Sequence, residues 1–205
     1  MTNNYALLKK LREKTGAGFQ DCQKVLAETN GDLVKAEEIL RKKGQKIVAV
    51  KSARQTKAGL IGVYLHSNEK IAALVELGCE TDFVARHSEF KELAHDLAMQ
   101  VAAMNPLYLK PEDVPPDILE KEKEIYREEL SAKGGSASGV KKEKKPAKIL
   151  ERIIEGKLEK NYETTCLLRQ SFIKDQNLKI EDLIKSKIAR LGENIKIRRF
   201  VRFEI

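Results

Sequence analysis

Three apolar stripes with helical spacing occupy the first 45 residues. They consist of Leu7, Leu8 and Leu11, then Phe19, Cys22, Val25 and Leu26, then Leu33, Ala36, Ile39 and Leu40. The run Thr15–Gly18 separates the first two stripes, and Asn30 and Gly31 end the second. Asp32 is suited to be the N-cap of the third helix, which we expect to stop at Gly44. The pattern predicts a small three-helix domain over residues 1–45.

The pattern changes to that of a sheet after residues 46–57, which we interpret as a helical or irregular connector. Residues 60–65 and 71–77 are rich in β-branched and aliphatic side chains and flank the polar turn 67–70, which is typical of a β-hairpin. Further along, residues 195–205 alternate apolar and charged positions, the period of a half-buried strand. We expect this last strand to pair with the hairpin.

Helical spacing returns between these strands. Ser88 is a candidate cap for a helix that carries Phe90, Leu93, Ala94, Leu97 and Val101. Further helices are expected after Pro116, over residues 149–158, and over residues 180–191 with Gly192 closing the last one. Residues 133–146 are rich in Gly, Ser and Lys and predict a flexible linker. The fold class is therefore α+β, with a helical N-terminal domain and a core of antiparallel sheet flanked by helices over residues 58–205.

The formal net charge of +8 is unevenly distributed. Residues 1–57 carry 13 Lys and Arg against 6 Asp and Glu, residues 58–132 carry 7 against 15, and the short stretch 133–148 carries 6 against 1. Much of the excess thus lies in the linker, where it gives weak, unspecific attraction to polyanions. No apolar run approaches the length of a membrane span and the first ten residues lack a signal-peptide core, so we expect a cytosolic, cytoplasmic protein without membrane contact.

The residues predict little chemistry. Cys22, Cys79 and Cys166 are an odd number without C-x-x-C spacing and are expected to be buried thiols. The three histidines do not form a metal-binding pattern, and the glycines form neither a P-loop nor a dinucleotide fingerprint. Cys79 near His87 is the one conceivable thiol and base, but a cysteine at the end of an apolar strand is more often part of the core. We expect no enzyme, no metal site and no cofactor.

One segment between the hairpin and the next helix is unusual, because Asp82 and the large aromatic Phe83 are neighbours. On the residues alone, the more ordinary interpretation is that Phe83 folds back into the core and Asp82 caps a turn or helix. The alternative is a firmly based loop that pushes a ring and a carboxylate into the site of a partner.

Four sequence motifs favour the alternative interpretation of this segment. They are LREKTGAGFQDC at residues 11–22, CETDFVAR at 79–86, LLRQSFIKD at 167–175 and LGENIKIRRF at 191–200. Together and in this order they resemble elongation factor Ts of the bacterial type, in its short form. The resemblance spans nearly the whole chain.

The resemblance implies a ubiquitin-associated-like N-terminal domain and a core that docks on GDP-bound elongation factor Tu. It implies a guanine nucleotide exchange factor of translation elongation, which does not itself hold nucleotide or bind a specific nucleic acid. Asp82 and Phe83, within the run Thr81 to Val84, would intrude near the partner's magnesium site and help to dislodge the ion. The second contact would be made by Leu11, Ala17, Gly18 and Phe19. Short members of the family also pair with themselves, which implies a homodimer.

The first motif departs from the family pattern at two positions. Phe19 and Gln20 replace the methionine pair that is common in the first motif, although Phe19 keeps the apolar bulk.

The rival from another class is an RNA-binding protein that uses the basic N-terminal domain and the basic strand residues Lys196, Arg198, Arg199 and Arg202. Its weakness is the low aromatic content of 5%, which offers no stacking platform. A thiol enzyme that uses Cys79 is a weaker alternative, and so is a ubiquitin-type adaptor that uses residues 1–45, which would leave the second motif unexplained.

Overall fold

The computed structural model describes residues 2–133 and 147–205, with some terminal side chains of α1, α6 and α7 left out. The expected Gly/Ser/Lys linker at 133–146 therefore lies outside the described residues, except for Lys133, the last residue of a helix. The chain forms two compact units, Met1–Ala103 with Glu181–Ile205, and Met104–Ile180. The bounds of these two units differ from those of the expected domains 1–45, 46–57 and 58–205.

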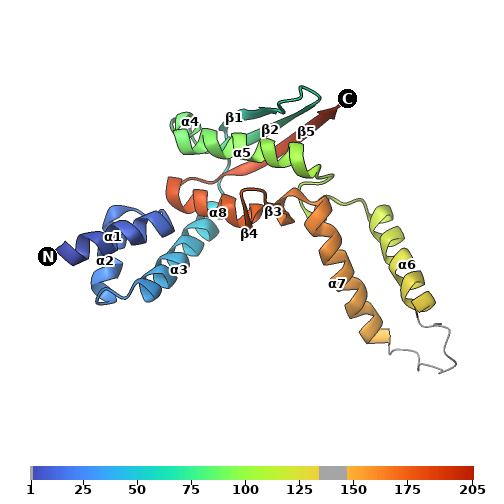
Figure 1. Cartoon of the computed structure of the whole chain (residues 1–205), viewed down its shortest axis with the longest axis horizontal. Helices are drawn as coiled ribbons and strands as arrows, with labels where there is room; N and C mark the ends of the chain where they lie inside the picture. Colours follow the sequence, from blue (N-terminus) through green and yellow to red (C-terminus); the bar gives the residue numbers. More distant parts are fainter. Residues whose placement is uncertain (1, 134–146) are drawn as a thin grey trace. The chain divides into compact units, whose positions relative to one another are not determined.

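The first unit begins with three helices, α1 Thr2–Thr15, α2 Phe19–Glu28 and α3 Leu33–Lys51, which we call the three-helix module (Figure 1). Its core consists of Leu8, Leu11, Cys22, Val25, Leu26, Ala36 and Leu40. Gly16 joins α1 to α2 with φ +65°, a conformation that glycine adopts without strain. The expected N-cap is confirmed, because the Asp32 carboxylate accepts hydrogen bonds at 3.1 Å from the backbone N–H groups of Val34 and Lys35.

The expected end of the third helix at Gly44 is wrong. Helix α3 continues through Gly44 to Lys51, so the first half of the expected connector is helical. A single glycine weakens a helix by about 1 kcal/mol but does not end it when the flanking residues form helix readily. A Cβ atom at position 44 would lie 3.4 Å from the Cβ of Ala189, which shows how closely α3 approaches a later helix.

The sheet of the first unit has three antiparallel strands in the order β1, β2, β5. Strand β1 Ala58–Leu65 and strand β2 Ile71–Cys79 form the predicted hairpin, and β5 Lys196–Glu204 pairs with β2 as expected. Aliphatic side chains on both central and edge strands stabilise this pairing by burial on one face. The prediction of an α+β fold with an antiparallel sheet is confirmed.

The alternation expected in the last strand is interrupted by a β-bulge. Glu76 pairs with Arg199, but the next residue, Leu77, pairs with Ile197, so Arg198 is an extra residue in β5. Because side chains alternate between the faces of a strand, odd positions before and after the bulge point to opposite faces. Ile197 is buried opposite Leu77, whereas Val201 is exposed on the other face.

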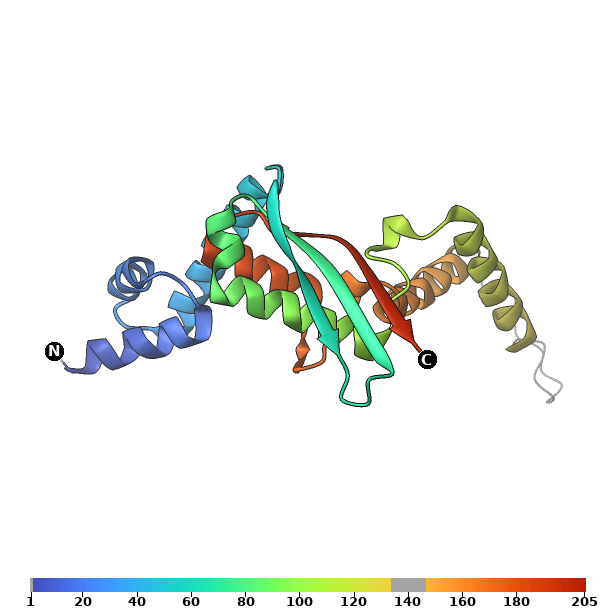
Figure 2. The ribbon, with the colours of Figure 1, turned by 90° about the horizontal axis from the view of Figure 1, so that it is seen from above.

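One face of the sheet packs on α5 Ser88–Met104, which follows the short helix α4 Asp82–Arg86. Figure 2 shows the strands lying over α5, and Figure 1 shows α8 Ile180–Leu191 beyond α5 from the sheet. The predicted apolar stripe of α5, with Phe90, Leu93 and Leu97, is buried. The expected cap Ser88 is instead the first residue of the helix. His87 takes the capping place, because its ring Nδ1 accepts from the backbone N–H of Glu89 at 3.3 Å.

The second unit is built on α6 Pro116–Lys133 and α7 Ala147–Thr165, which lie side by side. Asn161 on α7 donates to the hydroxyl of Tyr126 on α6 at 3.3 Å, and the ammonium of Lys157 lies 4.8 Å from the centre of the Tyr126 ring. The 3₁₀ turns η1 Pro111–Asp113 and η2 Leu167–Arg169 and the hairpin of β3 Ser171–Phe172 and β4 Asp175–Lys179 complete this unit.

We expect Gly62→Ala to destabilise the first unit by about 1–3 kcal/mol, since the helix must move away from the sheet. The added Cβ would lie 2.2 Å from the backbone oxygen of Ala94 on α5. Gly156→Ala is the matched control, because a Cβ there meets no atom within 4 Å, and helix propensity predicts stabilisation by up to about 1 kcal/mol. Urea unfolding followed by circular dichroism measures both effects. A Gly62→Ala protein as stable as the unmutated one would contradict the close packing of α5.

Candidate functional site

The segment Thr81–Val84, which we call the wedge segment, leaves the end of β2 and begins α4. Phe83 is 82% exposed and Asp82 is also exposed, whereas the next residue, Val84, is 5% exposed. The more ordinary expectation, with Phe83 in the core and Asp82 as a cap, is therefore wrong. Thr81 is the cap, since its hydroxyl oxygen accepts from the Val84 N–H at 3.4 Å, and Val84 supplies the anchor that leaves Phe83 facing outward.

A carboxylate from a distant part of the chain holds the base of the wedge segment. Glu193, in the loop between α8 and β5, accepts from the backbone N–H groups of Glu80 and Thr81, each at 3.0 Å. The Thr81 hydroxyl donates to the other oxygen of Glu193 at 2.7 Å. Charge-assisted hydrogen bonds of this kind are stronger than neutral ones, so the segment starts from a fixed backbone position.

Glu80 makes the reciprocal contact. Its Oε1 accepts from the backbone N–H of Asn194 at 2.7 Å, and its Oε2 accepts from Arg54 at 3.2 Å. These donors, the Asn194 N–H first, lower the pKa of Glu80. Asn194 is itself buried and donates to the backbone oxygen of Arg54 at 2.7 Å. The connector after α3, the loop before β5 and the wedge segment are thus joined in one hydrogen-bonded network.

The second expected surface lies on the three-helix module. Phe19, the first residue of α2, is 47% exposed, and the exposed Gly18 and the partly buried Ala17 lie beside it in the chain. Leu11 is fully buried in the module core, so it supports this surface from below. An open groove of about 470 Å³ runs beside Phe19 and is lined by Tyr5, Leu8, Lys9, Arg12, Glu13, Phe19 and Arg190. Its rim is mainly cationic.

A third surface is the side of the sheet away from α5. Ile61, Val63, Leu65, Val201 and Phe203 are each between 39% and 63% exposed there, and we call this set the open sheet face. The pairing register places them together, because Val63 and Val201 both flank Leu74. In Figure 2 no helix of the first unit covers the strands from this side. Such a contiguous apolar patch is typical of an interaction surface.

The basic strand on which an RNA-binding function would depend is largely occupied by contacts within the protein. Arg198 and Arg199 both bind the carboxylate of Glu76, at 2.9 and 2.7 Å. Arg202 donates to the backbone oxygen of Ala102 at 2.9 Å. These arginines hold the sheet together, which weakens the case for a nucleic-acid surface on β5.

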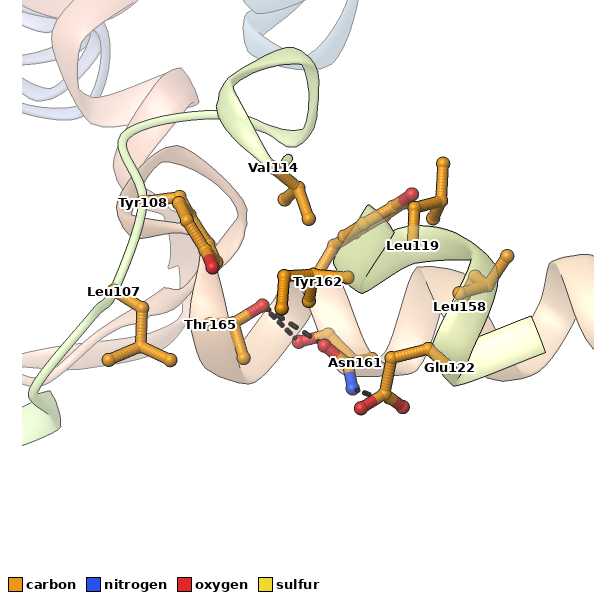
Figure 3. Close-up of a pocket in the computed structure, with 10 residues that line it drawn as sticks. Leu107, Tyr108, Val114, Leu119, Glu122, Leu158, Asn161, Tyr162 and Thr165 are labelled. Carbon is orange, nitrogen blue, oxygen red and sulfur yellow. Dashed lines mark hydrogen bonds between the residues drawn. The ribbon is translucent and has the colours of Figure 1, made fainter. Parts of the chain in front are cut away.

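The described residues form no metal-binding cluster, and the pocket between α6 and α7 is small. They contain no group of three or more His, Cys, Asp and Glu side chains that could hold a metal ion. The pocket in Figure 3, between α6 and α7, has a volume of about 100 Å³, whereas ligand pockets usually measure about 300–1,000 Å³. Apolar side chains such as Leu107 and Tyr162 surround a polar corner where Asn161 bonds Thr165 and Glu122.

The cysteines are buried and free, as expected. Burial raises the pKa of Cys79, whose thiol donates to the backbone oxygen of Thr81 at 3.1 Å. The ring of His87 is engaged with the Glu89 amide, so the structure does not support the thiol and base pair. Across residues 2–133 and 147–205, every helix is too short or too polar to span a bilayer.

Comparison with known proteins identifies this architecture. The family model described as Elongation factor TS matches residues 6–205. Elongation factor Ts of Fervidobacterium nodosum is 54% identical over 97% of this chain and 96% of the relative. Elongation factor Ts of Thermotoga maritima is 54% identical over 97% of this chain and 94% of the relative, and that of Thermodesulfovibrio yellowstonii is 50% identical over the same shares.

A fold with exposed apolar groups on a firmly held base, together with these matches, defines a translation elongation factor. The chain belongs to the elongation factor Ts family.

Glu193 and Asn194 were not predicted as site residues, although they lie in the last of the four motifs. Their role depends on contacts 112 to 142 positions away in the chain, which no local pattern reveals. The available signal was the adjacent pair of a carboxylate and an amide in a loop between a helix and a strand. Residues of these types in a loop often serve to bind backbone groups.

We expect Glu193→Ala to loosen the wedge segment without unfolding the protein. The amides of Glu80 and Thr81 would lose their acceptor, and the loss of about 1–2 kcal/mol should speed their hydrogen exchange by about 5- to 30-fold. Hydrogen exchange followed by NMR measures this. Glu92→Ala, which removes an exposed carboxylate from α5, is the matched control and should leave both amides unchanged. Unchanged exchange in Glu193→Ala would mean that Glu193 does not fix the segment.

Proposed function

We propose that this protein binds elongation factor Tu in its GDP-bound form and promotes release of GDP, so that GTP can replace it. The observation that carries the proposal is Phe83, 82% exposed beside the exposed Asp82 on a base fixed by Glu193 and Glu80. A large exposed ring on a rigid base is suited to enter a pocket of a partner, because little conformational entropy is lost on binding.

The exchange would proceed without covalent chemistry, so the protein would act as a binding factor and not as an enzyme. In nucleotide-binding proteins of this class magnesium bridges the phosphates and a P-loop hydroxyl, and it demands near-ideal octahedral geometry. Insertion of the Phe83 ring and the Asp82 carboxylate near that ion would displace its ligands and weaken the binding of GDP. Linkage then requires that GDP weakens binding of this protein by the same factor.

The three-helix module would make the second contact. Phe19 presents an exposed ring with Ala17 and Gly18 beside it, and Leu11 fixes the α1 side of this turn from the core. Lys9 and Arg12, on the α1 side of the neighbouring groove, favour a partner surface with acidic residues. Since the proposed partner acts in protein synthesis, the proposed place of action is the cytoplasm.

The open sheet face supports a homodimer. Five large apolar side chains exposed together are unfavourable in water, and a second copy would bury the same patch on both subunits. The proposed assembly with the partner then contains two copies of each protein.

Phe83→Ala and Asp82→Ala are expected to slow the release of GDP from elongation factor Tu by about tenfold or more relative to the unmutated protein. Stopped flow with a fluorescent GDP analogue measures the rate. Leu107→Ala, which truncates an apolar side chain that is 63% exposed in the second unit, is the matched control and should act like the unmutated protein. If the unmutated protein leaves the rate of GDP release unchanged, the proposed function is wrong.

Val63→Glu is expected to convert a dimer to a monomer, because a charge on the open sheet face would be buried without a partner. Sedimentation velocity at micromolar concentrations gives the oligomeric state. The control is Val34→Glu on α3, where the valine is 76% exposed and the dimer should persist. An unmutated protein that sediments as a monomer would refute the proposed dimer.

A further inference from the structure

The last turn of α8 lies against the three-helix module at two glycines. A Cβ atom at Gly16 would lie 3.1 Å from the Cδ of Arg190, and one at Gly44 would lie 3.4 Å from the Cβ of Ala189. Glycine at both positions lets the backbone of the module come close to α8. The side chain of Arg190 therefore packs on the turn that leads into Ala17, Gly18 and Phe19, and it lines the same groove as Phe19.

The guanidinium end of Arg190 reaches a different part of the first unit. Its Nη2 lies 2.6 Å from Oε1 of Glu89, and the Nζ of Lys187, one turn earlier on α8, lies 3.5 Å from Oε2 of the same carboxylate. Glu89 is in the first turn of α5, three positions after Arg86 ends α4. A carboxylate at a helix N-terminus is also favoured by the helix dipole. The side chain of Arg190 thus contacts both the Gly16 turn and the first turn of α5.

We propose that Arg190 is a positioning residue that holds the Phe19 surface at a fixed distance from the wedge segment. This inference rests on the proposed function, in which one partner meets both surfaces. When two contacts are held in the right relative position, the second forms as an intramolecular step with a high effective concentration. Loss of the connection leaves each contact intact but makes the two less able to form together.

The chemistry of arginine fits this role. Its stem packs on the glycine turn while its planar, permanently charged end binds the carboxylate, and lysine lacks that fork. An ion pair with this much exposure adds little to stability by itself, since Arg190 is 48% and Glu89 20% exposed. We therefore expect Arg190→Ala to fold normally, so that its effects report on position and not on unfolding.

The first test needs no partner. Nuclear relaxation of backbone amides gives the local correlation time of α1 to α3 and, separately, of β1, β2 and α5. In the unmutated protein the two should be equal, and in Arg190→Ala that of the module should become shorter. Lys185→Ala is the matched control, because Lys185 is on the same helix but forms its ion pairs with Glu181 at 2.5 Å and Asp182 at 3.7 Å, both within α8.

The second test uses GDP release from elongation factor Tu over a series of protein concentrations. Arg190→Ala should raise the half-saturating concentration by about tenfold while the maximal rate stays unchanged, since the wedge segment itself is intact. Phe19→Ala should then raise that concentration by a smaller factor in the Arg190→Ala background than in the unmutated one.

Equal correlation times in Arg190→Ala, or a Phe19→Ala effect that does not depend on Arg190, would overturn the inference. If the module loosens as expected but the unmutated protein fails to speed GDP release, the proposed function fails and the mechanical link between the module and α5 remains established. The two failures are therefore distinguishable.

Discussion

The arrangement of the first unit depends on two reciprocal contacts, in which a carboxylate of each of two loops binds the backbone of the other. Glu193 accepts from the backbone at Glu80 and Thr81, and Glu80 accepts from the backbone at Asn194. Each carboxylate accepts hydrogen bonds from backbone N–H groups of the other loop, so the two loops stabilise each other. The outward direction of Phe83 follows from these reciprocal hydrogen bonds together with the burial of Val84.

The apolar periodicity of the sequence was sufficient to predict the longer helices, the β1–β2 hairpin and the last strand, because each of these signals is local. The short helix α4 and the β3–β4 hairpin were not predicted. The exposure of Phe83 was not predicted from the residues, since an aromatic ring contributes to a core or to an interface with the same side chain. The family resemblance, and not the local pattern, favoured the outward position. The end of α3 was also missed, because Gly44 serves its close approach to Ala189, a contact that no window of sequence contains.

The three surfaces differ in how far they could be foreseen. Phe19 was expected at a contact, and it is half exposed, but Leu11 from the same motif lies wholly in the core. The part of the open sheet face that Val201 and Phe203 form was hidden in the sequence by Arg198, because one extra residue reverses the direction of the side chains that follow it in β5. Arg198, Glu193 and Arg190 all act through long-range pairing, and for that reason their roles become visible only in the folded chain.

The distance between Thr81 and Glu193 along the chain also affects the order in which the protein can mature during its own synthesis. The 112 positions that separate them take about 6 to 20 s to translate at typical rates of 5–20 residues per second. During that interval the hairpin and α5 can form, but the base of the wedge segment lacks its acceptor. A nascent chain that lacks Glu193 therefore carries Phe83 on a loosely held base, and the ribosome completes most of the protein before this ring acquires a defined direction.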